Sequence, residues 1–156
     1  MMDKFYDFKN WGINMEKTTI NESKLIELAI EARQASYSPY SNFMVGAAIL
    51  TESGKVYTGC NIENAAYTPT NCAERTAFFK AVSERERKFK SIAIVGGSKD
   101  GLLDFCAPCG VCRQVMMEFC DYDNFKIILG KSKDEYKVYT LKDLLPMGFG
   151  PENLSD

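Results

Sequence analysis

The chain has 156 residues, of which 46% are hydrophobic and 26% are charged, and its formal net charge is −2. This length is typical of one domain with a single sizeable core, and the slight acidic excess disfavours nucleic acid and anionic membrane surfaces as partners. The sequence contains no histidine, which excludes a Ser-His-Asp or Cys-His catalytic site and any zinc site with imidazole ligands.

Residues 1–20 carry charges throughout and show no clean hydrophobic period. We interpret them as an N-terminal extension in front of one domain, residues 21–156. They lack the apolar stretch of a secretion signal, and no segment of the chain approaches the roughly 18 apolar residues of a membrane span. The sequence therefore predicts a cytoplasmic protein without a membrane partner, whose six cysteines are reduced.

Hydrophobic periodicity predicts an alternation of helices and strands after the extension. Asn21 is a suitable N-cap for a first helix that ends at residues 38–39. Buried strands are predicted at residues 43–50 and 55–60. Gly46 within the first strand indicates a close approach of another backbone segment.

The rest of the chain continues this alternation. Helices are predicted at residues 72–85 and 108–120, and strands at residues 89–96, 125–129 and 136–141. The resulting order, α-β-β-α-β-α-β-β, predicts an α/β domain with one mixed sheet covered by helices.

A Cys-x-x-Cys pair is the strongest local motif of the sequence. Cys109 and Cys112, in the segment PCGVC, are spaced to share one face of a helix, so both sulfurs reach the same ion. The positive end of that helix favours the thiolate form that metals bind. Taken alone, the motif also fits two small core residues or a redox pair.

A second segment, NCAE at residues 71–74, also stands at a predicted helix start. Cys72 there is a candidate third thiolate. Glu74 lies two residues further on and does not share the helical face of Cys72, so we expect it to stand outside the metal and to take a proton from metal-bound water. A capping box, with Asn71 as N-cap and Glu74 at the third helical position, is the structural alternative.

Three protein ligands and a water are typical of a catalytic zinc site. Three thiolates leave the zinc centre with a net charge of −1, and Arg75 beside Cys72 is the first candidate to offset it by donating to sulfur. Arg113 is a second candidate. Both arginines are equally compatible with an exposed surface position.

The three remaining cysteines allow two other kinds of metal site. Cys60, Cys106 or Cys120 as a fourth ligand would close the site and make it structural. The run Cys106-x2-Cys109-x2-Cys112 also resembles part of an iron–sulfur motif, although Cys120 stands too far along for the usual spacing.

Five motifs stand in order along the chain, namely FMVGAA at 43–48, GCNIENA at 59–65, CAER at 72–75, PCGVCRQ at 108–114 and LLPMGFGP at 144–151. Together they resemble the cytidine deaminases, the small homotetrameric zinc enzymes that act on free nucleosides. The resemblance covers about residues 21–154, and the N-terminal extension and Cys106 depart from it. It implies a three-layer α/β/α sandwich with one mixed five-stranded sheet.

The resemblance also implies a reaction, namely hydrolysis of cytidine and 2'-deoxycytidine to uridine and 2'-deoxyuridine with release of ammonia, a step of pyrimidine salvage. One Zn²⁺ per chain, on Cys72, Cys109 and Cys112, carries the hydroxide that attacks C4 of the base, and Glu74 shuttles the protons. The substrate roles that it implies are Asn61 and Glu63 on the ribose hydroxyls, Phe43 against the pyrimidine, the Ala73 backbone at the base edge, and Tyr67 and Phe149 reaching a neighbouring subunit's site in a homotetramer.

Two other kinds of deaminase are alternatives to a nucleoside deaminase. A deaminase of another cytosine-like compound, such as blasticidin S, would share the metal and Glu74. A polynucleotide deaminase would need a basic track that the composition does not indicate. The carboxylate of Glu63, close to the expected sugar, favours a nucleoside over a nucleotide.

Overall fold

The computed structural model describes residues 20–154. The predicted N-terminal extension, residues 1–20, lies outside the described residues except for Ile20. None of the helices within the described part has the length and apolar character needed to cross a bilayer. The elements, in chain order, are α1 (Glu22–Arg33), β1 (Phe43–Thr51), β2 (Val56–Cys60), α2 (Ala73–Ser83), β3 (Phe89–Ser98), α3 (Gly110–Phe119), β4 (Lys126–Gly130), β5 (Tyr136–Thr140), α4 (Leu141–Leu144) and a short 3₁₀ turn (Pro151–Asn153).

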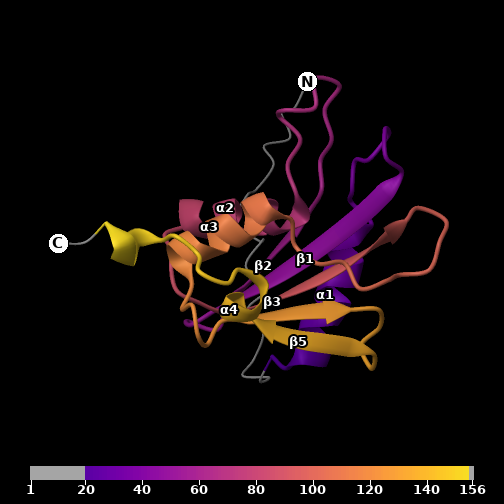
Figure 1. Ribbon diagram of the computed structural model, residues 1–156. Coiled ribbons are helices and arrows are strands. Elements are labelled where there is room, and N and C mark those ends of the chain that lie inside the picture. Colours follow the sequence, from indigo (N-terminus) through magenta and orange to yellow (C-terminus); the bar gives the residue numbers. More distant parts are fainter. Residues whose placement is uncertain (1–19, 155–156) are drawn as a thin grey trace, which may run out of the picture.

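The five strands form one mixed sheet in the order β2-β1-β3-β4-β5 (Figure 1). β1 pairs antiparallel with both β2 and β3, and β5 pairs antiparallel with β4. β3 and β4 are parallel, because α3 lies in the connection that carries the chain back to the start of the sheet. The predicted mixed five-stranded sheet is confirmed.

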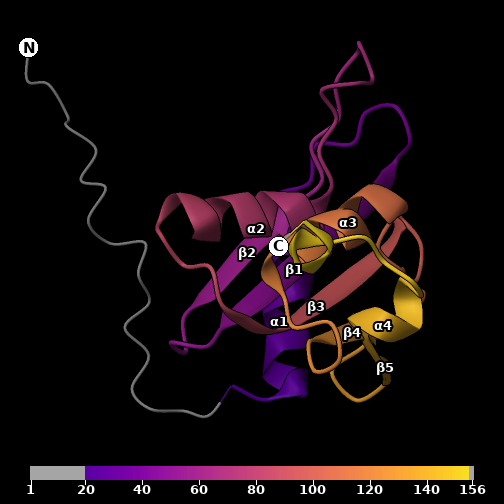
Figure 2. The same cartoon turned by 60° about the vertical axis from the view of Figure 1, so that its left-hand side comes forward.

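The sheet is covered by helices on both faces, with α2 and α3 on one side and α1 on the other (Figures 1 and 2). Successive residues of a strand point to opposite faces. Ile49 therefore joins a core with Phe78 of α2 and Met116 of α3, while Ala48 joins a second core with Leu25 and Ile26 of α1. The two cores establish the predicted three-layer α/β/α sandwich.

The first helix is shorter than predicted. Asn21 caps it as expected, accepting a hydrogen bond from the backbone N–H of Lys24, but α1 ends at Arg33 rather than at residues 38–39. The chain leaves the helix because the backbone of Tyr37 exchanges hydrogen bonds with Asn61 and Glu63 (3.0 and 2.8 Å). This pairing brings the segment before β1 beside the segment after β2.

The capping box considered as the structural alternative for Glu74 is not formed at α2. Cys72, not Asn71, is the N-cap residue, and it makes no capping hydrogen bond through its side chain. The amide of Asn71 donates instead to the hydroxyl of Thr76 (3.1 Å), so Glu74 has no reciprocal partner at the helix start. Helix α4 and the 3₁₀ turn were not predicted, because four and three residues are too few to show a period.

The close approach predicted at Gly46 is present. A Cβ at this position would lie 2.0 Å from the carbonyl oxygen of Ala29 and 2.6 Å from the backbone nitrogen of Arg33, both in α1. We expect Gly46→Ala to lower the free energy of unfolding by about 3 kcal/mol or more, since backbone atoms cannot move aside. Thermal unfolding measures the change. Gly110→Ala is the matched control, because a Cβ there has no neighbour within 4 Å; equal melting of the two variants would contradict the tight α1–β1 contact.

Candidate active site

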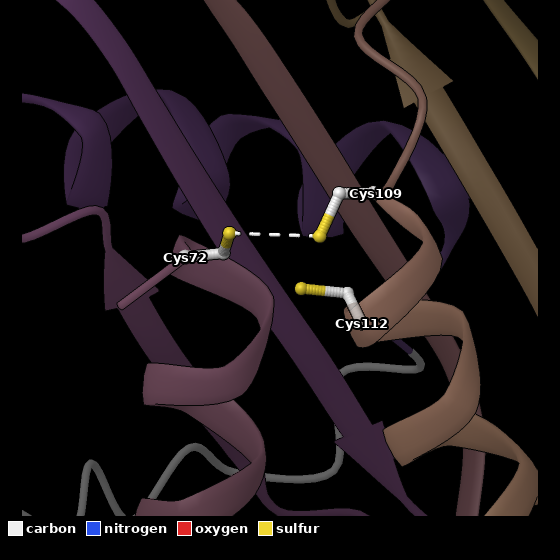
Figure 3. A group of neighbouring side chains, drawn as sticks. All are labelled: Cys72, Cys109 and Cys112. Carbon is white, nitrogen blue, oxygen red and sulfur yellow. Dashed lines mark hydrogen bonds between the residues drawn. The ribbon is translucent and has the colours of Figure 1, made fainter. Parts of the chain in front are cut away.

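Two helix starts bring three cysteines together on one side of the sheet (Figure 3). Cys72 and Cys109 are the N-cap residues of α2 and α3, and Cys112 lies in the first turn of α3. Their sulfur atoms all lie within 4.8 Å of one another, and the Cys72 and Cys109 sulfurs are 3.8 Å apart. A tetrahedral zinc with bonds of roughly 2.3 Å needs sulfurs about 3.8 Å apart. The Cys72 and Cys109 sulfurs have this separation, and the Cys112 sulfur lies within 4.8 Å of both, so the trio is suited to such an ion.

The other cysteines stand apart from this cluster. Among the described residues, no fourth Cys, Asp or Glu offers a ligand atom within the same distance. Neither the closed four-cysteine site nor an iron–sulfur site is therefore formed by Cys60, Cys106 or Cys120. Burial raises the pKa of the Cys106 thiol to about 11, with further contributions from Glu74 and Cys72.

The cysteine cluster concentrates negative charge. The pKa of Cys72 falls to about 5 because the Cys112 thiol donates a hydrogen bond to it and because Arg75 lies beside it. The pKa of Cys112 rises correspondingly, through that shared hydrogen bond and through burial. A divalent cation bound by thiolates displaces such protons, so the donor set is suited to a metal.

The two candidate arginines point to different partners. Arg75 donates from Nη2 to the sulfur of Cys72 (3.6 Å), and its buried Nε has no hydrogen-bond partner among residues 20–154. Arg113 does not donate to the sulfurs. It donates to the carbonyl oxygens of Pro108 (2.7 Å) and Leu144 (2.6 Å), because its side chain leaves α3 on the side that faces the C-terminal segment.

Glu74 is a buried carboxyl group next to the cluster. It lies in the first turn of α2 and is only 4% exposed. Burial raises its pKa to about 7, and the negative charge of Cys72 adds to the rise. It is not a member of the group of candidate ligands. Glu74 is therefore a buried carboxyl group that interacts with Cys72 and Cys112 but stands outside the candidate ligand set.

The candidate sugar-binding residues make hydrogen bonds around the start of β1. Asn61 accepts from the backbone N–H of Val45 (2.8 Å) and from the Ser36 hydroxyl (2.5 Å), and its amide donates to the Phe43 carbonyl (2.8 Å). Phe43 itself is 41% exposed. Asn61 thus fixes the strand end that presents the Phe43 ring.

Glu63 is held in a similar way. Its carboxylate accepts hydrogen bonds from the backbone N–H groups of Tyr40 (2.9 Å) and Ser41 (3.2 Å) and from the Ser41 hydroxyl. The Ser41 hydroxyl is the main cause of the lowered pKa of Glu63, so this residue is a carboxylate at neutral pH. Ser36 and Ser41 were missed at the sequence level, where nothing in their local pattern distinguishes them from loop serines.

The remaining candidate substrate residues, Ala73, Tyr67 and Phe149, differ in their exposure to solvent. Ala73 is fully buried at the start of α2, whereas the side chains of Tyr67 and Phe149 are exposed by 74% and 58%. The segment between β2 and α2, which contains Tyr67, projects from the body of the sandwich (Figures 1 and 2). The Tyr67 ring contacts Tyr40 edge-on, with ring centroids 6.2 Å apart. Within one chain, neither exposed ring is covered.

Comparison with known proteins identifies the family. Residues 19–127, which include all three cysteines of the cluster and Glu74, match the model of the cytidine and deoxycytidylate deaminase zinc-binding region. The chain belongs to this family. The predicted resemblance and the zinc-binding character of the domain are thereby confirmed.

Individual deaminases of this family align over nearly their whole length. A cytidine deaminase from Sporosarcina psychrophila is 49% identical over 132 residues, covering 85% of this chain and 93% of that protein. One from Halalkalibacterium halodurans is 47% identical over 137 residues, covering 88% of this chain and all of that protein. The crystal structure of cytidine deaminase from Burkholderia pseudomallei superposes with a TM-score of 0.75 at 45% identity, covering 83% of this chain and all of that chain. These relatives do not favour the blasticidin S alternative.

Proposed function

We propose that the chain is a zinc-dependent hydrolase that deaminates cytidine and 2'-deoxycytidine to uridine and 2'-deoxyuridine and releases ammonia, as a step of pyrimidine salvage. The observation that carries this proposal is the placement of buried Glu74 beside three sulfurs spaced for a tetrahedral ion. The deaminases to which the chain is 47–49% identical support the choice of substrate.

Cys72, Cys109 and Cys112 would hold one Zn²⁺ per chain. When bound, the metal supplies Lewis acidity that makes water a nucleophile near neutral pH. The three sulfurs supply three corners of a tetrahedron, and no further ligand among residues 20–154 competes for the fourth. The exposure of Cys109 leaves the cluster accessible from outside.

Glu74 is the proton carrier in this proposal. Its carboxylate accepts the first proton of the attacking water and delivers it to N3 of the cytosine ring. It then accepts the remaining proton of the hydroxyl group now bonded to C4 and delivers it to the amino group, so that the C4–N bond breaks, ammonia leaves and the C4 carbonyl of uridine forms. Because Glu74 is almost fully buried, the proton passes between the reacting atoms rather than to bulk solvent. Arg75, which donates to the Cys72 sulfur, offsets the surplus negative charge of three thiolates around a divalent ion.

Asn61, Glu63, Phe43 and the Ala73 backbone are the proposed substrate contacts. Glu63 favours a nucleoside over a nucleotide, because a carboxylate near the sugar repels a phosphate. Its oxygens already accept three hydrogen bonds from Tyr40 and Ser41, so they are oriented before a sugar hydroxyl arrives. The phosphate-bearing substrate implied by the deoxycytidylate half of the family description is the second candidate.

Assembly into a homotetramer belongs to the same proposal. Tyr67 and Phe149 are exposed in the single chain, as expected for rings that reach a neighbouring subunit's site. Sedimentation at equilibrium measures the subunit number. The cytoplasmic location predicted from the N-terminal sequence stays a prediction, as does the boundary of one catalytic domain at residue 21.

A substrate panel tests the proposed function. Zinc-loaded protein with its metal content measured is mixed with cytidine, 2'-deoxycytidine, deoxycytidylate and blasticidin S, and loss of the cytosine absorbance is followed. We expect turnover of both nucleosides and a kcat/KM at least about 100-fold lower for deoxycytidylate, since a like-charge contact costs several kcal/mol. A chain with one zinc bound that leaves cytidine unchanged would refute the proposal, and faster turnover of deoxycytidylate would favour the second candidate.

A further inference from the structure

Arg113 directly follows the last cysteine of the cluster and bridges two separate segments of the chain. Its Nε donates to the Pro108 carbonyl at 2.7 Å, and its Nη1 donates to the Leu144 carbonyl at 2.6 Å. Both are short hydrogen bonds from a charged donor, a class roughly twice as strong as neutral ones. The guanidinium group therefore ties the peptide before Cys109 to the end of α4.

The segment around Cys109 is restrained by the burial of Pro108 and by the hydrogen bond from the Arg113 backbone N–H to the Cys109 carbonyl (3.0 Å), but the side formed by Cys109 and Gly110 is open. Cys109 is exposed, and a Cβ built on Gly110 would have no neighbour within 4 Å, so packing does not hold the turn on that side. Among the described residues, Arg113 is the only side chain that donates a hydrogen bond to the Pro108 carbonyl. The position of the Cys109 sulfur consequently depends on the carbonyl that Arg113 holds.

The other end of the bridge is a stable anchor. Leu144 closes α4, a short helix that begins with a reciprocal capping box between Thr140 and Asp143. Leu141 of the same helix is fully buried in the main core. The Tyr122 hydroxyl donates to the adjacent Leu145 carbonyl (2.9 Å). Arg113 thus links the end of α4, which is packed on the core, to the turn that carries the exposed Cys109.

We propose that Arg113 is a positioning residue that fixes Cys109 for metal binding by holding the Pro108 carbonyl against the end of α4. It acts on retention of the metal and not on the chemical step. The proposal rests on the proposed function only in taking zinc as the metal. Groups that orient metal ligands from outside typically change metal affinity by 10–100-fold.

Zinc release from the full-length, zinc-loaded protein tests this role without any use of catalysis. Arg113→Gln, Arg113→Lys and the parent are mixed with a chromogenic chelator, and the zinc dissociation constant is obtained by competition. We expect Arg113→Gln to weaken zinc binding by about 10–100-fold. Arg113→Lys is expected to fall between the two, because one ammonium group keeps the charge but cannot reach both carbonyls.

Gln114→Ala is the matched control. Gln114 is the next residue of α3, and its amide donates to the Phe149 carbonyl (2.8 Å), so this variant removes a bond to the C-terminal segment but leaves the Pro108 carbonyl held. It should retain zinc as the parent does. The proposal would be overturned if Arg113→Gln bound zinc as tightly as the parent. It would also be overturned if Gln114→Ala lost as much zinc affinity as Arg113→Gln. Circular dichroism checks folding, and Arg113→Lys keeps the comparison measurable if the glutamine variant does not fold. Both outcomes are measured as zinc affinity, so the test does not depend on cytidine turnover.

Discussion

Glu74→Gln is expected to reduce the kcat for cytidine by about 10²–10⁴-fold or more while the chain keeps its zinc. The glutamine side chain has nearly the same size as glutamate and fits the same buried position, but its amide cannot accept the proton of the attacking water. The three cysteine ligands are unchanged, so metal content should equal that of the parent. Turnover by absorbance and zinc by atomic absorption, on one preparation, measure both quantities.

A matched carboxylate separates the role of Glu74 from a general effect of charge. Glu31 is exposed on α1, the helix on the opposite face of the sheet. Glu31→Gln therefore removes the same charge without touching the site, and we expect parental turnover from it. Full activity in Glu74→Gln would remove the proton carrier from the proposed mechanism. Loss of zinc together with activity would instead make Glu74 a residue that supports metal binding.

Cys112→Ser is expected to weaken zinc binding by more than about 100-fold and to abolish turnover at ordinary zinc concentrations. A direct ligand should matter more than the groups around it, whose loss typically costs 10–100-fold. Cys112 is fully buried between α2 and α3, so solvent does not readily replace the lost sulfur. Zinc competition with a chelator measures the affinity, and the melting temperature should no longer rise with added zinc, because that rise reflects metal bound to the folded state.

Cys60→Ser is the control for this substitution. Cys60 ends β2 and does not belong to the cluster of sulfurs within 4.8 Å of one another. The same chemical change there should leave zinc affinity at the parental value. If Cys60→Ser lost zinc and Cys112→Ser kept it, the identity of the third ligand would have to be reassigned.

The site was predictable from the sequence to the extent that its parts are local. Cys109 and Cys112 are one helical turn apart, so their convergence needs only the helix that follows Pro108. Glu74 two residues after Cys72 is likewise a local relation. The two arginines differ in this respect, since only Arg75 has a local partner in the cluster. Arg75 reaches the neighbouring Cys72, whereas Arg113 bonds to Leu144, 31 positions away, and no pattern in the sequence reports that distance.

The predicted end of the first helix was wrong because tertiary contacts compete there with helix propensity. α1 stops at Arg33 because Tyr37 pairs with the segment after β2. The Arg33 side chain then donates to the carbonyl oxygens of Met44, Gly97 and Ser98. These bonds link the end of α1 to the ends of β1 and β3, a set of partners that periodicity within one segment does not reveal.

The sequence by itself determined the number of strands and the alternation that divides them between two cores. It also determined which residue types are proposed to bind zinc and to carry a proton. Each of these depends on spacing within one segment. Only the tertiary structure decided that Cys72 meets Cys109 and Cys112, that Glu74 is buried beside them, and that Arg113 holds the turn. Those relations depend on how α2 and α3 lie on the same face of the sheet, which is set by strand order and by packing between residues far apart in the chain.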